Sequence, residues 1–421
     1  MPDKYPDLKT RIPGSVRQVC LRLKEEGYRV YLVGGCVRDT LLGLSPHDWD
    51  LTTDATAEQM RGVLSDYRTV DTGIRHGTLT CLSDGMPVEI TTYRSSRGKT
   101  VPLRLEDDLV CRDLTVNAIA YSEEEGFIDP TGGLADLERR ILRAPGNPSD
   151  RFDEDGLRVL RVARFAAQTG FAIEEKTYRE AVRCAPYLKQ IAAERIFAEF
   201  SKTILGDSFE QVANRFGALW SLIVPGSFLA LQTAACAQAV SHAPKNLPVR
   251  LALVLQDGVR GYPVPPFSPG ALMKQLRLDH VTSGRVKKII GFPYADLRAQ
   301  KECIHHLILD QGPDVFLDAV AYQYAQGFSA RDRKDRALDN LEQRRDAILQ
   351  CYGELKSEGA VFSLSDLAVN GLDLMASGFA AGPAIGDMLG TLAHAVADRR
   401  VPNEKQALLS YAASLGTKEK E

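Results

Sequence analysis

The stretch GGCVRDTLLGLSPHDWDLTT, residues 34–53, decides the fold that this sequence predicts. An apolar run, YRVYLV, precedes it and indicates a strand that ends at two glycines, after which VRDTLLG begins a short helix. Asp48 and Asp50 then lie two residues apart in a second predicted strand, so both carboxylates project from one face. This order of strand, glycine turn, helix and strand predicts an α/β unit.

The same stretch carries groups suited to phosphate and metal. Gly34 and Gly35 let a phosphate approach the backbone, the N–H groups at the helix start can bind it, and Arg38 adds a bidentate cation. Asp48 and Asp50 offer two hard oxygen ligands that can hold Mg²⁺. The alternative for a DxD pair taken alone is a solvated strand face.

A third carboxylate follows in PVEITTYR, residues 87–94. Glu89 alternates with Val88 and Ile90, so it points away from the face that these apolar side chains bury. We predict that Glu89 completes a two-metal catalytic site with Asp48 and Asp50, in which the ions activate a hydroxyl and clamp a phosphoryl group. The alternative is a glutamate that only faces solvent.

The rest of the chain changes character about one third of the way along. Further strands are predicted at HGTLTCL and PVEITTYR, whereas beyond about Arg143 the apolar spacing of LRVLRVARFAAQTG and ERIFAEFSKTIL is helical. We therefore predict an α+β fold, with a small α/β head followed by an all-helical arm. The predicted divisions are 1–143, 144–206, 207–300 and 301–421.

Composition limits the class of protein. The 52 Lys and Arg residues against 55 Asp and Glu residues leave a net charge of −3, so any nucleic-acid site must be a local patch. Eight cysteines without a CxxC spacing argue against zinc and disulfides and favour a reducing cytoplasm. The most apolar long stretch, Leu222 to Val240, is cut by Pro225 and Gly226, so no membrane contact is expected.

Seven motifs in this order resemble those of the class II (bacterial-type) tRNA nucleotidyltransferases and their poly(A) polymerase relatives. The motifs are GGCVRDTLLGLSPHDWDLTT, TGIRHGTLT, VEITTYR, RDLTVNAIAY, IDPTGGLADLERRILRA, DEDGLRVLRVARFAAQTGF and ERIFAEFSK. A looser match is VNGLDLMASGFAAGPAIGDML near the C-terminus. The resemblance implies a polymerase β-like nucleotidyltransferase head, a helical neck with a nucleotide-reading helix, a helical body and a helical tail that binds tRNA.

The resemblance also implies residue roles. Asp48 and Asp50 match metal ligands, while other positions match nucleotide contacts. Those positions are Gly35, Arg38, Arg112, Asp155, Arg158, Arg161 and Arg164.

The chemistry of two of these residues agrees with such a role. Cytosine and adenine both present an amine donor beside a ring-nitrogen acceptor, whereas uracil and guanine present the reverse order. Asp155 can accept from the amine and Arg158 can donate to the ring nitrogen, and their i, i+3 spacing predicts neighbours on one face of a helix. Arg161 would then touch another part of the nucleotide or primer, with Arg164 farther round the helix. The alternative is an acidic helix N-terminus and a solvated basic face.

RDLTVNAIAY adds candidates for the sugar pocket. Asn117 follows Asp113 by four residues, which predicts a local hydrogen bond that orders the pocket beside Arg112. The alternative is a capped helix start.

Two features of the arm have weaker signals. Arg285, Lys287 and Lys288 belong to a basic cluster that could grip RNA phosphate, although solvated surface is the alternative. His305 and His306 lack an adjoining aspartate, so we predict no phosphohydrolase site and interpret them as a helical histidine pair, one half-buried.

The expected reaction is template-independent transfer of CMP from CTP to the 3′ end of tRNA. The link from Ser95 to Cys111 lacks about ten residues of the flexible loop that the resembling CCA-adding enzymes carry there, more than ordinary loop variation explains. This predicts a CC-adding enzyme that leaves the terminal A to a separate A-adding enzyme. The alternatives are full CCA addition with CTP and ATP, a poly(A) polymerase, and an inactive RNA-binding relative, which intact Asp48, Asp50, Asp155 and Arg158 disfavour.

Overall fold

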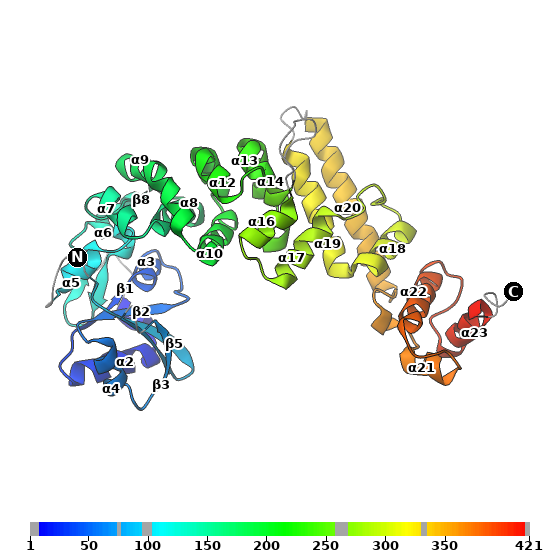
Figure 1. The fold of residues 1–421 in the computed structure, drawn as a ribbon, viewed down its shortest axis with the longest axis horizontal. Coiled ribbons are helices and arrows are strands. Elements are labelled where there is room, and N and C mark those ends of the chain that lie inside the picture. The colour runs from blue at the N-terminus through cyan, green and yellow to red at the C-terminus, as the bar shows by residue number, and fades with distance from the viewer. Residues whose placement is uncertain (1–7, 74–76, 95–102, 257–267, 330–334, 417–421) are drawn as a thin grey trace. The chain divides into compact units, whose positions relative to one another are not determined.

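The computed structural model describes residues 8–73, 77–94, 103–256, 268–329 and 335–416. The chain divides into two compact units, Met1–Ser208 and Phe209–Glu421. The first holds the α/β head and the helices that follow it, and the second is helical throughout its described residues (Figure 1). The predicted α+β class is therefore confirmed.

The first unit is built on a mixed sheet with the strand order β3-β4-β5-β2-β1-β6-β7 within the described residues. Its strands are β1 (Val30–Val33), β2 (Trp49–Thr53), β3 (Arg68–Gly73), β4 (Thr78–Ser83), β5 (Met86–Thr92), β6 (Ala120–Ser122) and β7 (Gly126–Ile128). β2 and β5 pair in parallel, and the other pairs are antiparallel. The strands predicted at residues 28–33, 47–53, 76–82 and 87–94 are thus present as β1, β2, β4 and β5.

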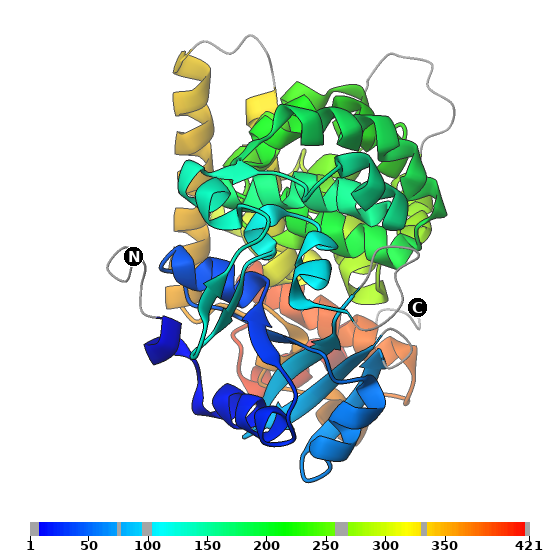
Figure 2. The same ribbon diagram turned by 90° about the vertical axis from the view of Figure 1, so that its left-hand side faces the viewer.

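Two helices cover the sheet side by side. α2 (Gly14–Glu25) and α4 (Ala57–Val63) contact each other and β4 (Figures 1 and 2). On α2, Val16, Val19 and Leu23 follow the spacing of one helical face and are fully buried. The apolar face of α2 therefore packs against one side of the sheet, where α2 contacts β1 and β4.

The remaining described elements of the first unit are helices, 3₁₀ turns and a further pair of strands. They are α1 (Leu8–Arg11), α3 (Gly35–Leu41), α5 (Leu105–Val110), the 3₁₀ turn η2 (Thr115–Asn117), α6 (Gly133–Arg139), β8 (Ile141–Leu142), α7 (Pro148–Glu154), α8 (Leu157–Thr169), β9 (Ala172–Ile173), α9 (Glu175–Cys184), η3 (Ala185–Gln190) and α10 (Ala193–Ile204). α8 packs along α10.

The expectation that strands stop near Arg143 is wrong for one short pair. β9 follows α8 and pairs in parallel with β8. A two-residue strand carries too little alternation to be distinguished in the sequence.

The expectation of one helix running through Asp155 to Arg164 is also wrong. α7 ends at Glu154, Asp155 has an extended backbone with φ −149° and ψ 104°, and α8 begins at Leu157. The Asp155 carboxylate accepts a hydrogen bond at 3.1 Å from the N–H of Leu157, the first residue of the new helix. A Cβ on Gly156 would lie 2.8 Å from the Tyr187 Cβ, so only glycine permits this close approach.

The second unit consists of helices and short 3₁₀ turns in its described residues. They are α11 (Phe209–Arg215), α12 (Gly217–Ile223), α13 (Phe228–Leu231), α14 (Thr233–His242), α15 (Leu247–Leu255), α16 (Pro269–Gln275), α17 (His280–Ile290), α18 (Lys301–Gln311), α19 (Pro313–Gln326), η4 (Gly327–Ser329), α20 (Asp335–Ser357), η5 (Leu364–Asp366), α21 (Gly371–Ala376), α22 (Pro383–Ala397) and α23 (Lys405–Gly416). None of the helices in the described part of the chain is long and apolar enough to cross a membrane.

The predicted histidine pair lies on α18. His305 is buried, whereas His306 is partly exposed and its Nδ1 lies 2.6 Å from Nδ1 of His394 on α22. His306 Nε2 also lies 2.7 Å from an oxygen of Asp398, and His394 Nε2 lies 3.1 Å from one of Asp310. The pair therefore connects α18 to α22. All eight cysteines have free thiols, in agreement with the absence of a disulfide pattern.

Gly206 gives a direct test of the packing of the first unit. A Cβ at this position would lie 2.5 Å from the backbone carbonyl carbon and oxygen of Ala167 on α8. Because helix backbone cannot yield easily, Gly206→Ala should lower the free energy of unfolding by about 1–3 kcal/mol in a urea titration. Gly62→Ala on exposed α4 is the matched control, since its Cβ would meet nothing within 4 Å and should stabilise by about 0.4–1 kcal/mol. Equal effects of the two substitutions would contradict this packing.

Candidate functional site

The turn from β1 to α3 brings Gly34 close to Arg112 and Asp50 of the predicted site. Gly34 has φ +82°, a backbone conformation that disfavours a side chain. A Cβ there would lie 3.4 Å from both the Arg112 Nη1 and the Asp50 Oδ2. The guanidinium predicted to bind phosphate and the carboxylate predicted to bind metal therefore both lie close to the glycine turn.

The carboxylates predicted to bind metal lie on neighbouring strands. Asp50 on β2 is in register with Glu89 on the parallel strand β5, and Asp48 directly precedes β2. Trp49 and Leu51 are buried while Asp48 is exposed and Asp50 partly exposed, as the predicted alternation requires. Glu89 is exposed, on the side away from buried Val88 and Ile90.

Burial and the neighbouring acids disfavour the charged form of Asp50. Burial, and then the nearby Glu89 carboxylate, raises the pKa of Asp50 to about 6, although the Arg112 guanidinium opposes the shift. Asp48 adds to the repulsion. Mutually repelling oxygen donors at a phosphate-accepting turn fit a hard cation such as Mg²⁺. Within the described residues, however, no three His, Cys, Asp or Glu side chains already form a closed metal cage.

Arg38 and Arg112 are both held in place by acids. Arg38 donates from Nη1 to the Asn117 Oδ1 at 2.6 Å and from Nε to Asp39 at 2.8 Å. Arg112 donates from Nε and Nη2 to the buried Oδ2 of Asp108, at 3.2 and 2.9 Å. Fixed arginines of this kind can bind a triphosphate without first being ordered.

The predicted bond between Asp113 and Asn117 is present and belongs to a larger network. Asn117 Nδ2 donates to the Asp113 Oδ1 at 3.1 Å, and Arg161 on α8 donates from Nε to the Oδ2 at 2.8 Å. Burial alone would raise the pKa of Asp113, but the Arg161 guanidinium and the Asn117 hydrogen bond hold it well below its usual range. Glu199 on α10 joins this network, with Arg161 Nη1 at 3.3 Å and Arg164 Nε at 2.5 Å.

Arg164 is the most enclosed of these arginines. Only 8% of it is exposed, and it also donates from Nη1 to the Gln168 Oε1 at 2.8 Å. Arg164 is therefore buried among the side chains that surround the candidate site. Arg161, in contrast, is partly exposed beside Asp113.

The predicted base-reading pair lies at the break between α7 and α8. The Asp155 Oδ2 accepts a hydrogen bond from Arg195 Nη2 at 2.7 Å. Arg158 donates from Nη1 to Glu154 at 2.9 Å and from Nη2 to the Cys111 carbonyl at 2.7 Å. Each member of the pair thus has its own partner, and each retains hydrogen-bonding capacity for a base.

Several of these partners were missed from the sequence. They are Arg94, Asp108, Glu154, Arg195 and Glu199. Asp108 precedes Arg112 by four residues, and this spacing on a helical turn was the available signal. Glu154 likewise precedes Arg158 by four residues. Arg195 and Glu199 are not marked by local spacing, apart from their positions within the quoted motifs.

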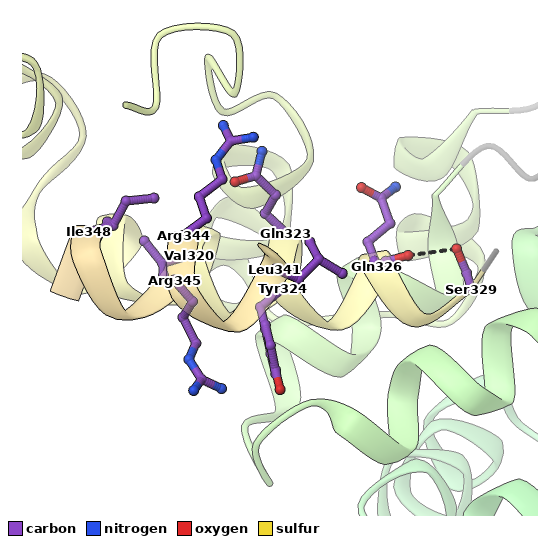
Figure 3. A pocket seen from close by; sticks show the side chains of 10 residues that line it. Val320, Gln323, Tyr324, Gln326, Ser329, Leu341, Arg344, Arg345 and Ile348 are labelled. Carbon is purple, nitrogen blue, oxygen red and sulfur yellow. Dashed lines mark hydrogen bonds between the residues drawn. The ribbon is translucent and has the colours of Figure 1, made fainter. Parts of the chain in front are cut away.

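The predicted RNA contacts lie in the second unit. Arg285 on α17 is turned toward acids of α19, since its Nε donates to Asp318 at 2.7 Å. Lys287 and Lys288 are exposed. A pocket of about 350 Å³ in the same unit contains none of the predicted site residues, and in it Arg345 lies over the Tyr324 ring at 4.2 Å (Figure 3).

Models of known families match three parts of the chain. Residues 30–143 match the poly A polymerase head domain, residues 170–215 match the probable RNA and SrmB-binding site of polymerase A, and residues 300–412 match a putative tRNA nucleotidyltransferase domain 2.

Full-length relatives and solved structures extend the match. A CCA-adding enzyme of Limosilactobacillus fermentum is 32% identical over 417 residues, covering 95% of this chain and 96% of that protein. One of Streptococcus gordonii is 31% identical over 93% of this chain and 94% of its own. The CCA-adding enzyme of Bacillus stearothermophilus in complex with CTP has a TM-score of 0.71 and 25% identity, with 96% and 98% of the chains covered. The Thermotoga maritima CCA-adding enzyme complexed with tRNA shares the fold, with a TM-score of 0.62, 19% identity and 97% of each chain covered. The chain therefore belongs to the class II tRNA nucleotidyltransferase and poly(A) polymerase family, and it is a tRNA nucleotidyltransferase.

Proposed function

We propose that this enzyme adds the complete CCA sequence to the 3′ end of tRNA from CTP and ATP. The observation that supports the proposal is that hydrogen bonds hold the Asp155 carboxylate, an acceptor, and the Arg158 guanidinium, a donor. An acceptor and a donor of this kind suit the edge that cytosine and adenine share. The full-length relatives named CCA-adding enzymes support the same choice.

Asp48, Asp50 and Glu89 would hold Mg²⁺ where the start of β2 lies beside the middle of β5. When bound, the metal would activate the terminal hydroxyl of the tRNA and offset the charge that develops on the phosphoryl group. Gly34 and Gly35 leave room for the triphosphate, and Arg38 and Arg112 bind its oxygens. Asp113 and Asn117 order the ribose end of the pocket.

The base is selected by protein side chains. The Asp155 carboxylate accepts from the exocyclic amine, and Arg158 donates to the ring nitrogen. Arg161 lies beside Asp113, toward the sugar, and Arg164 supports it through Glu199. On the second unit, exposed Lys287 and Lys288 would contact tRNA phosphates, while Arg285 is engaged with Asp318.

One observation favours the narrower activity of CC addition. β5 ends at Thr92 and α5 begins at Leu105, so residues 93–104 link the two elements. This link is shorter than the flexible loop that the family resemblance predicts for a CCA-adding enzyme. Residues 95–102 of this link lie outside the described part of the chain. In this second candidate function, a separate A-adding enzyme completes the tRNA.

Single-nucleotide extension separates the two candidates. A tRNA ending at the discriminator base is incubated with CTP alone, ATP alone or both, and the products are resolved to one nucleotide. Full CCA addition predicts two additions with CTP and a third when ATP is present. Efficient stopping after two cytidines with both nucleotides would favour the CC-adding candidate, and adenylation of unrelated RNAs would contradict both.

Substitution of the carboxylates tests the metal site. Asp50→Asn should lower the rate of every nucleotide addition by at least about a thousandfold, because it removes a metal ligand worth several kcal/mol. The fold should persist, since the amide replaces a charge that burial and Glu89 disfavour. Asp84→Asn in the exposed turn between β4 and β5 is the control and should keep normal rates. Near-normal turnover of Asp50→Asn in saturating Mg²⁺ would remove Asp50 from the site.

A further inference from the structure

Asp108 is a fully buried carboxylate that the proposed chemistry does not use directly. It lies on α5 with 0% of its surface exposed. Its Oδ2 accepts from Arg112 Nε at 3.2 Å, from Arg112 Nη2 at 2.9 Å and from the Thr52 hydroxyl at 3.2 Å. Its Oδ1 accepts from the backbone N–H of Arg94 at 3.1 Å. A buried charge is tolerated only when it is paired and hydrogen-bonded in this way.

The geometry of these bonds determines which way Arg112 faces. A guanidinium is planar, so a partner that occupies Nε and Nη2 on one edge fixes the direction of the remaining nitrogen. That nitrogen, Nη1, lies 3.4 Å from the position that a Cβ on Gly34 would occupy, and the Asp50 Oδ2 lies at the same distance from it. Asp108 therefore aims the free end of Arg112 at the place where the glycine turn and the metal-binding strand meet.

The other two bonds connect the same carboxylate to the strands of the site. Thr52 lies on β2 two residues after Asp50, and Arg94 follows the end of β5, the strand that carries Glu89. One side chain thus ties together the two strands that carry the carboxylates and the arginine opposite them.

We propose that Asp108 is a positioning residue that holds Arg112 on the triphosphate of the incoming nucleotide. The inference rests on the proposed function, because it takes the nucleotide to bind between Gly34, Arg112 and the carboxylates. Asp108 itself touches no substrate. Its contribution to nucleotide binding passes through Arg112, whereas a purely structural acid would contribute independently of Arg112.

A double-mutant cycle in the full chain distinguishes these roles. Asp108→Asn, Arg112→Gln and the double variant are compared by direct CTP binding without tRNA, and by KM and kcat in the extension assay. Asp108→Asn should weaken CTP binding and raise KM for CTP about tenfold or more, the scale of a lost bond to a charged group, with a smaller change in kcat. In the Arg112→Gln background, Asp108→Asn should add less than about twofold, since the residue it positions is already gone.

Glu106→Gln is the matched control, because Glu106 lies two residues away on α5 and is exposed. It should leave CTP binding and turnover unchanged. The inference would be overturned if Asp108→Asn weakened CTP binding equally in the wild-type and Arg112→Gln backgrounds. It would also be overturned if Asp108→Asn did not weaken CTP binding at all. A wild-type protein that binds no CTP would instead contradict the proposed function.

Hydrogen exchange keeps the inference testable if Asp108→Asn fails to fold. In the wild-type protein, CTP on Arg112 should strengthen the Asp108 contacts and slow exchange of the Arg94 amide, which donates to the Oδ1. Exchange at the amides of exposed α4 should not change. The inference would be overturned if saturating CTP did not change the exchange rate of the Arg94 amide.

Discussion

The candidate nucleotide site depends on the ion pair between Arg161 and Asp113, a buried and ionised aspartate. Asp113 lies just before the η2 turn of the head and is paired with Arg161 on α8, which in turn meets Glu199 on α10. The arginine holds the pKa of Asp113 far below its usual range, so the carboxylate stays charged in the interior. Removing one partner of such a buried pair typically costs about 3–5 kcal/mol, because the other charge is left uncompensated. The network therefore ties α8 and α10 to the head.

The same arrangement recurs around the site. Arg38 is paired with Asp39, Arg112 with Asp108 and Arg158 with Glu154. Each acid removes the freedom of a long cationic side chain before the nucleotide arrives, so less entropy is lost on binding. The chain as a whole has a net charge of −3, so in the proposed site it is this locally ordered set of arginines that would bind the triphosphate. Opposite them, Asp48, Asp50 and Glu89 supply the negative charge that a metal ion requires.

Much of this could be predicted from sequence because it is local. The glycine turn, the Asp48 and Asp50 pair, the outward face of Glu89 and the bond between Asp113 and Asn117 each depend on spacings of a few residues. The distant partners could not be predicted in this way. Arg161 and Asp113 are 48 positions apart, and Arg195 and Asp155 are 40 apart, so each pair meets only through tertiary packing. The break at Asp155 was missed for a different reason. Acids before an apolar run also suit a helix N-terminus, and the close approach of Gly156 to Tyr187, which requires the glycine, is visible only in the structure.

Base selection by the protein itself is the central claim, and the most direct measurement is misincorporation. Asp155→Ala and Arg158→Ala are compared with the wild type for kcat/KM with each of CTP, ATP, UTP and GTP on the same tRNA. Arg179→Ala on the exposed face of α9 serves as the control. If Asp155 and Arg158 read the base, each variant should lose about 1–3 kcal/mol of discrimination against UTP and GTP, roughly a ten- to hundredfold change in the ratio. Unchanged rejection of UTP and GTP in both variants would show that the base is selected elsewhere.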